Sequence, residues 1–248
     1  MQFSEDAIKR LITAIGYAPQ DGKSGIYLKS YQNHDGYCIF VDFNNQQIIY
    51  DSDENPSGVA IKVWERTTSN FSQSENFVVL ECVDSLLEKG YAPSCIELEK
   101  TYPSGHGRSG RLDILVKSVD DVPFLMIECK TWGAEFDKEQ SKMLKNGGQL
   151  FTYYANDRAT EFLCLYASQI NGQVYQALRK FLIIGTKTSK TTVFSTVMLR
   201  HMMLSIGHLR MANWKPSRKN IVGKSTTKLW RYCAIMPFLI SPMPLISC

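Results

Sequence analysis

The feature that most constrains this chain is a pair of apolar stretches that each carry charged residues. Residues 111–117 (RLDILVK) and 124–130 (FLMIECK) are separated by a short turn and predict two antiparallel strands. Apolar side chains occupy both faces of these strands, which is typical of a buried sheet, where an unpaired charge is costly. The occurrence of three charged residues, Asp113, Glu128 and Lys130, in these predicted buried strands therefore indicates a functional role or a specific pairing.

Symmetric pairing about the turn sets Asp113 directly opposite Glu128. Facing side chains in a sheet have Cβ atoms about 5 Å apart, so two carboxylates there repel each other unless a cation lies between them. Lys130 follows Glu128 by two residues, and strand alternation sends both side chains to the same face. We expect the hairpin to present two carboxylates and one ammonium group at a single point.

Such a group suits Mg²⁺, which takes oxygen ligands and is usually held by one or two carboxylates together with substrate phosphates. The chemistry indicated is metal-assisted phosphodiester hydrolysis, with Asp113 and Glu128 as metal ligands. Lys130 then orients the attacking water or offsets the charge that develops on the phosphate. The alternative, from these three residues alone, is an edge hairpin whose charges face solvent.

Asp113 and the run Glu128-Cys129-Lys130 resemble the D…(D/E)xK signature of the PD-(D/E)xK nucleases. Gln149 and Tyr153 resemble a QxxxY element that follows this signature in one branch of the superfamily. That branch contains the nuclease domains of type I restriction enzyme R subunits and of single-chain proteins that join a nuclease to an N6-adenine methylase. The resemblance covers about residues 70–168.

The resemblance implies a restriction-endonuclease-like α/β fold, in which helices flank a central mixed β-sheet, and Mg²⁺-dependent cleavage of double-stranded DNA. It implies that Gln149 and Tyr153 help to organise the active site and contact DNA. It also implies that a helix before the hairpin supplies a further carboxylate, for which Glu75 fits better than Glu81. The sequence departs from the family motif at Arg111-Leu112, where a proline often precedes the first Asp.

In that family, methylase and specificity subunits or domains act together with the nuclease, and they are the expected partners besides DNA. Their absence from residues 1–248 leaves two alternatives open. One is a DNA-binding or assembly module that keeps the fold without turnover. The other is an inactive remnant of a larger restriction-methylation protein.

The segments around the hairpin predict the rest of an α/β domain. Apolar side chains at helical spacing, stretches of strand-forming residues and glycine breaks give the following elements: a helix over 75–89 that Gly90 ends, a strand over 95–99, a helix over 136–156 that breaks or kinks at 147–148, and a strand over 161–167. The catalytic residues would then lie on a sheet that helices cover.

The loop before the hairpin, residues 102–111, is rich in glycine and positive charge. Glycines let a backbone approach a polyanion closely, and the guanidinium groups of Arg108 and Arg111 match phosphate oxygens in geometry. These two arginines are our candidates for binding DNA. The alternative is a plain mobile turn, and His106 is expected to be an exposed loop histidine.

The first 70 residues predict a separate small β-rich unit. Residues 4–15 have the spacing of an amphipathic helix, alternating stretches over 25–49 predict short strands, and the polar segment 51–58 reads as a linker. No catalytic pattern occurs there. Docking onto the nuclease domain, residues 71–168, or onto a partner is the expected role.

The last 80 residues differ sharply in charge from the rest. Residues 169–248 contain twelve Lys or Arg and no Asp or Glu, which leaves sixteen basic and all 24 acidic residues in the first 168. A basic DNA-binding arm is one explanation. A shifted reading frame is the explanation we favour, because codons compatible with 225–244, read one nucleotide earlier, encode an amphipathic helix resembling the linker to a methylase. We therefore expect 169–248 to be out of frame or disordered.

The cysteines and the apolar runs indicate the compartment. Seven cysteines occur at irregular spacing without a CxxC pair, which favours free thiols in a reducing cytoplasm. Residues 1–6 are acidic and no long apolar run follows, so neither a signal peptide nor a membrane partner is expected.

Overall fold

The computed structural model describes residues 4–55, 58–103, 109–146, 148–171, 174–183 and 192–195. The contacts between residues divide the chain into two compact units, residues 1–193 and 194–248. The first unit contains all the elements that position the candidate site, and the fold described below is that of this unit together with residues 194–195, which end its last strand.

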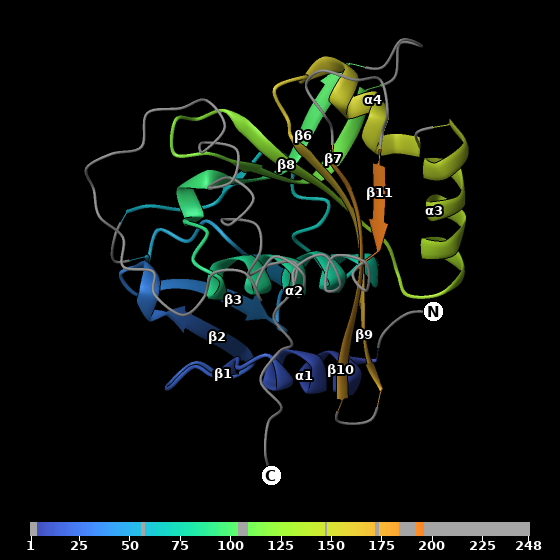
Figure 1. The fold of residues 1–248 in the computed structure, drawn as a ribbon. Helices are drawn as coiled ribbons and strands as arrows, with labels where there is room; N and C mark the ends of the chain where they lie inside the picture. Colours follow the sequence, from blue (N-terminus) through green and yellow to red (C-terminus); the bar gives the residue numbers. More distant parts are fainter. Residues whose placement is uncertain are drawn as a thin grey trace, which may run out of the picture. The chain divides into compact units, whose positions relative to one another are not determined.

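Two β-sheets with helices packed against them make this a mixed α/β structure, as predicted (Figure 1). The smaller sheet is antiparallel, with strand order β1-β2-β3-β4. Its strands are β1 (Ala18–Pro19), β2 (Ile26–Tyr31), β3 (Tyr37–Asp42) and β4 (Gln47–Ile49). The larger sheet is mixed and has the order β11-β10-β9-β8-β7-β6-β5. Its strands are β5 (Lys62–Val63), β6 (Ile96–Pro103), β7 (Ser109–Lys117), β8 (Pro123–Cys129), β9 (Phe162–Asn171), β10 (Val174–Ile183) and β11 (Thr192–Ser195).

The predicted hairpin forms between β7 and β8, and its register is the expected one. Ile114 pairs with Ile127, Leu115 with Met126 and Val116 with Leu125, so Asp113 and Glu128 are the next positions in the same register. A bulge between Val116 and Lys117 ends the regular pairing toward the turn. The apolar side chains of both strands are fully buried, which confirms that this is a central hairpin and not a solvated edge.

Four helices and two short 3₁₀ turns complete the described fold. The helices are α1 (Glu5–Ala14), α2 (Glu75–Glu88), α3 (Ala134–Asn146) and α4 (Gly148–Asn156), and the turns are η1 (Gln32–His34) and η2 (Pro93–Cys95). The side chain of Ser4 caps α1 by accepting a hydrogen bond from the amide of Ala7. The helix predicted over 136–156 is broken, as expected, and Gly148 begins α4 in the left-handed region with φ +58°.

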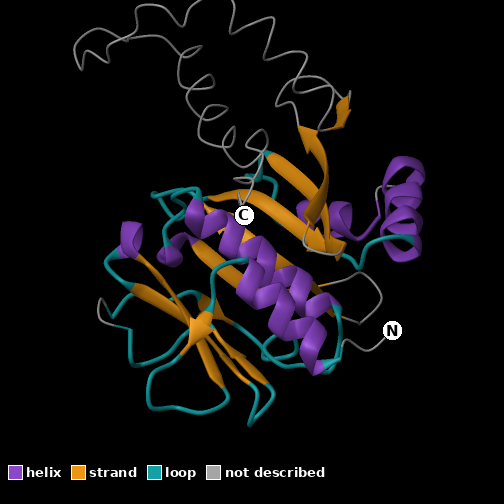
Figure 2. Ribbon diagram, turned by 90° about the horizontal axis from the view of Figure 1, so that it is seen from below, coloured by secondary structure: helices purple, strands orange, loops and turns teal. Residues whose placement is uncertain are grey.

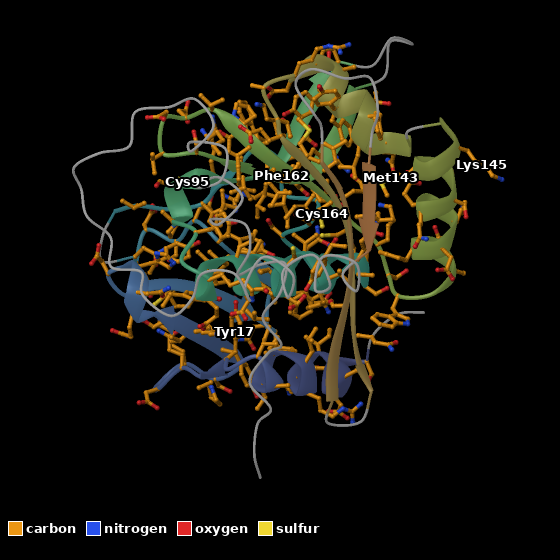
Figure 3. All side chains as sticks on the ribbon, in the orientation of Figure 1. Tyr17, Cys95, Met143, Lys145, Phe162 and Cys164 are labelled. Carbon is orange, nitrogen blue, oxygen red and sulfur yellow. The ribbon has the colours of Figure 1, made fainter. Side chains whose placement is uncertain are left out.

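Helix α2 packs against β8 and β9 and also contacts the smaller sheet, so it lies between the two sheets (Figures 1 and 2). Helix α4 packs against β6, β7 and β8, while α3 packs against β9 and α4. Met143 and Lys145 of α3 point in opposite directions, toward the sheet and toward solvent (Figure 3). One hydrophobic cluster joins α3 and α4 to the larger sheet and includes Leu115, Met126 and Leu150.

The expected boundaries at residues 70 and 168 do not coincide with the observed architecture. Strand β5 lies within the first 70 residues but pairs in parallel with β6 of the larger sheet. Lys29 of the smaller sheet forms an ion pair with Asp84 of α2, at 2.6 Å between Nζ and Oδ1. At the other end, β9 runs to Asn171 and β10 pairs with it through Ile183. The described residues up to Ile183 thus share one network of sheets and helices, and composition alone does not reveal such long-range contacts.

Most of the basic segment lies outside the described residues, including 196–248. Residues 169–171, 174–183 and 192–195 form strands of the larger sheet, so the expectation of disorder is wrong for them. For the rest of the segment, disorder or a shifted reading frame remains a prediction. Within the described part of the chain, no helix is both long enough and apolar enough to cross a membrane.

Candidate functional site

Asp113, Glu128 and Lys130 come together at the end of the β7–β8 hairpin, where Glu75 of α2 joins them. Lys130 Nζ lies 2.8 Å from Glu128 Oε1 and 3.1 Å from Glu75 Oε1, so the ammonium group bridges the two carboxylates. Asp113 Oδ2 accepts a hydrogen bond of 2.7 Å from the amide of Cys129, between Glu128 and Lys130. We call these four side chains the hairpin cluster.

The strand geometry explains why these side chains meet. Glu128 follows Met126 by two residues and Asp113 precedes Leu115 by two, so alternation sends both carboxylates to the face on which α3 and α4 pack. Cys129, between Glu128 and Lys130, is fully buried. Lys130 begins the connection to α3, and its amide donates to the carbonyl of Tyr166 on the parallel strand β9, at 2.8 Å.

Glu75, and not Glu81, is the helical carboxylate at the site, as predicted. Glu75 is the first residue of α2 and is partly exposed, which places its carboxylate at the end of the helix that faces Lys130. Glu81 lies two turns further on, is completely buried and accepts a hydrogen bond from the hydroxyl of Tyr166. The two glutamates therefore have different surroundings on one helix.

The protonation of the cluster reflects burial of like charges. Burial raises the pKa of Asp113 to about 7, although the positive charge of Lys130 opposes the shift. Burial also raises the pKa of Glu128 well above its ordinary value, and the negative charge of Asp113 raises it further. Burial alone lowers the pKa of Lys130, but the carboxylates of Glu128, Asp113 and Glu75 outweigh it, so the ammonium group stays charged.

The cluster contains three carboxyl groups and one ammonium group, and one carboxyl oxygen is unsatisfied. Glu128 is 2% exposed, and its Oε2 atom is buried without a hydrogen-bond partner among the described residues. A buried charged oxygen without a partner is energetically costly, so Glu128 Oε2 requires either a bound cation or a proton. The buried carboxyl group of Glu128 and the half-buried one of Asp113 form an oxygen donor set of the kind that Mg²⁺ prefers.

Asp113 and Glu128 therefore fit the role of ligands to a hard divalent cation, and the remaining coordination positions would belong to water and phosphate oxygens. Among the residues that the structure describes, no three His, Cys, Asp or Glu side chains are arranged to hold a metal ion by themselves. Lys130 stands between Glu75 and Glu128, which keeps Glu75 engaged with the ammonium group.

Tyr153 supports the site from α4, whereas Gln149 lies at its exposed rim. The Tyr153 hydroxyl donates to the carbonyl of Arg111, at 2.8 Å, and its ring is 2% exposed. An added Cβ at Gly110 would lie 2.7 Å from the Tyr153 ring, so glycine there permits the close approach. Tyr153 thus fixes the strand just before Asp113. Burial raises the pKa of its hydroxyl well above the ordinary range, and the nearby charges of Glu128 and Asp113 add to this.

The two arginines proposed for DNA binding are placed differently. Arg108 lies outside the described residues, as does His106. Arg111 is exposed and forms an ion pair with Glu65, at 2.8 Å between its Nη1 and Glu65 Oε2. A phosphate would have to compete with that carboxylate for Arg111.

Sequence reasoning missed two buried glutamates that shape the surroundings of the site. Glu99 of β6 is 1% exposed and binds the segment before α2. Glu139 of α3 is 5% exposed and accepts a hydrogen bond from the amide of Gln149, at 3.1 Å, so it holds the start of α4. Glu99 is an acidic residue within a predicted apolar strand, residues 95–99. An acidic residue in such a strand is the same signal that identified Asp113, so it could have pointed to Glu99.

Comparison of the sequence with models of known protein families finds no matching family. Comparison with curated proteins finds no significant relative.

Proposed function

We propose that this chain is a Mg²⁺-dependent endonuclease that hydrolyses phosphodiester bonds of double-stranded DNA within a restriction system. The observation that carries the proposal is the convergence of Asp113, Glu128 and Lys130 at the end of a central hairpin, with Glu128 Oε2 buried and unpaired. A sheet that serves only to build a domain has no packing reason to bring two acids and a lysine together at one point.

The arrangement gives each residue a distinct task. Asp113 and Glu128 would hold the ion, which when bound supplies positive charge at the phosphate and a water of lowered pKa. The charged ammonium of Lys130 orients the attacking water or offsets negative charge on the phosphate oxygens in the transition state. Glu75 keeps Lys130 in place through the contact at 3.1 Å.

The supporting residues fix the strand that carries Asp113. Tyr153 anchors β7 at the Arg111 carbonyl, and the exposed Gln149 forms a side-chain hydrogen bond with Tyr153 and would be free to contact DNA. Arg111 would exchange Glu65 for a phosphate oxygen when DNA binds, because both partners are exposed and such surface pairs are weak.

The direct test is cleavage of supercoiled plasmid DNA by the full-length chain in Mg²⁺ and in EDTA. We expect nicking and linearisation in Mg²⁺ alone, and their loss in Asp113→Asn and Lys130→Met. Glu97→Gln is the matched control, since Glu97 is a buried acid on the same sheet that pairs with Lys117. DNA binding without cleavage, or cleavage that survives Asp113→Asn, would overturn the proposal.

A further inference from the structure

Glu99 is a buried carboxylate that no feature of the proposed reaction uses directly. Its side chain is 1% exposed and both carboxylate oxygens accept hydrogen bonds. Oε2 accepts from the amide of Thr67, at 3.0 Å, and Oε1 accepts from the Thr67 hydroxyl and from the amide of Thr68. The carboxyl group of Glu99 thus binds one short segment ahead of α2, at Thr67 and Thr68.

The backbone of Glu99 is strained at the position that faces Asp113. Leu98 pairs with Ile114 and Lys100 with Leu112, so Glu99 and Asp113 share one register position, where the ladder pairing is interrupted. Glu99 has φ +58°, in the left-handed region that residues with a side chain rarely adopt. Strain of this kind persists where the surroundings enforce it, and it is concentrated at functional sites.

The segment that Glu99 holds is itself bound to the first turn of α2. Asn76 is 2% exposed, and its side-chain amide donates to the carbonyl of Thr67, at 3.0 Å, and to the carbonyl of Asn70, at 2.8 Å. Residues 67–70 are therefore clamped between Glu99 of β6 and Asn76 of α2. Glu75, the neighbour of Asn76, is the residue that binds Lys130.

We propose that Glu99 is a positioning residue for the hairpin cluster. By fixing residues 67–70 it fixes the first turn of α2, so that the Glu75 carboxylate holds Lys130 against Glu128. The inference rests on the proposed function for its effect on cleavage, but its structural part concerns the position of Lys130 and stands independently of any activity.

The test compares Glu99→Gln with Glu97→Gln in the full-length chain. Both residues are buried glutamates of β6 whose carboxyl groups accept hydrogen bonds. Glu97 accepts them from Trp64 and Lys117, whereas Glu99 accepts them from Thr67 and Thr68. Each oxygen of Glu99 accepts a hydrogen bond from a backbone N–H group. In Glu99→Gln, the side-chain NH₂ group would therefore face one of these N–H donors in either orientation, and that hydrogen bond would be lost. We expect Glu99→Gln to lower the cleavage rate at least tenfold more than Glu97→Gln at a matched loss of thermal stability.

A double-mutant comparison separates positioning from general damage. If Glu99 acts through Glu75, then adding Glu99→Gln to Glu75→Gln lowers the cleavage rate further by less than twofold, whereas adding Glu97→Gln multiplies the two single effects. Full multiplication of the Glu99→Gln and Glu75→Gln effects would contradict the proposal.

A measurement without DNA distinguishes failure of this inference from failure of the nuclease proposal. In protein labelled with ¹³C-lysine, the Lys130 side-chain signal, assigned by Lys130→Arg, should move in Glu99→Gln toward its position in Glu75→Gln and stay in place in Glu97→Gln. An unmoved signal in Glu99→Gln overturns the positioning role even if wild-type protein cuts DNA. A moved signal in a protein that never cuts DNA supports the positioning role and refutes only the nuclease.

Discussion

Two of the groups that pair a lysine with carboxylates, one at Lys130 and one at Lys29, differ in whether every buried polar atom is satisfied. In the hairpin cluster, Lys130 faces three carboxylates and Glu128 Oε2 has no hydrogen-bond partner. In the second cluster, Lys29 contacts Asp84, Glu88 and the carbonyl of Ile15 at 2.6 to 2.8 Å. We call the second group, with Tyr31, the Lys29 cluster.

The Lys29 cluster has the properties of a structural joint. Asp84 Oδ1 also accepts a hydrogen bond of 2.6 Å from the Tyr31 hydroxyl, so the charges of lysine and aspartate are matched and hydrogen-bonded. The cluster ties the smaller sheet to α2. A buried charged side chain whose polar atoms are all hydrogen-bonded therefore does not by itself indicate a functional site. A buried carboxylate with an oxygen that lacks a partner does indicate one.

The largest expected effect is on cleavage by variants of the hairpin cluster. Asp113→Asn or Glu128→Gln should lower the rate of plasmid cleavage by about a thousandfold, because a lost metal ion removes several kcal/mol of transition-state stabilisation. The free energy of unfolding, measured in urea, should stay the same or rise, since each variant neutralises one of two neighbouring acidic groups whose pKa values are raised in the folded protein. A large loss of stability would instead place this cluster in the same class as the Lys29 cluster.

The converse change is Asp84→Asn in the Lys29 cluster. Removing one partner of a buried ion pair should lower the free energy of unfolding by about 3 kcal/mol, because Lys29 keeps only the exposed Glu88 as a charged partner. Cleavage at a temperature where the variant is folded should be unchanged. Equal losses of cleavage in Asp84→Asn and Asp113→Asn would erase the distinction between the clusters.

A divalent cation should stabilise the folded protein through the hairpin cluster alone. At a concentration of Mg²⁺ one hundred times its dissociation constant, the free energy of unfolding should rise by about 2.7 kcal/mol. Thermal unfolding with and without Mg²⁺ measures this. The stabilisation should disappear in Glu128→Gln and persist in Asp84→Asn, and a stabilisation of equal size in both variants would point to another ion site.

The smallest expected effect is the pH dependence of stability in metal-free protein. Because the pKa of Asp113 is raised to about 7, the folded state binds its proton more tightly than the unfolded state. Stability contributed by that proton is present below the ordinary aspartate pKa and is lost as pH rises through about 7. Urea unfolding in EDTA should show this decline between about pH 4 and about pH 7, and Asp113→Asn should flatten it. An unchanged slope in Asp113→Asn would exclude Asp113 as its source.

The hairpin was predictable because its information is local. The turn and the alternation of apolar residues fix which positions face each other, so the register of Ile114 with Ile127 followed from the sequence. The break before α4 likewise followed from Gly147-Gly148. These two features need only neighbouring residues and periodicity, whereas the choice of Glu75 followed from the family resemblance, which implies a carboxylate on the helix before the hairpin.

The remainder depends on contacts between distant parts of the chain. Glu65 pairs with Arg111 across 46 positions, and Lys29 pairs with Asp84 across 55, so neither partner could be assigned from a local pattern. The left-handed backbone of Glu99 is likewise set by the tertiary contacts of Thr67 and Thr68. Composition predicted boundaries at residues 70 and 168, but strand pairing crosses both.

The most direct test of the central claim is calorimetric titration of Mn²⁺ into the metal-free full-length chain and its variants. Because Asp113 and Glu128 leave a buried oxygen uncompensated, wild-type protein and Asp84→Asn should each bind an ion at a site that Glu128→Gln loses. Absence of binding to wild-type protein, or binding that Glu128→Gln leaves intact, would contradict the account.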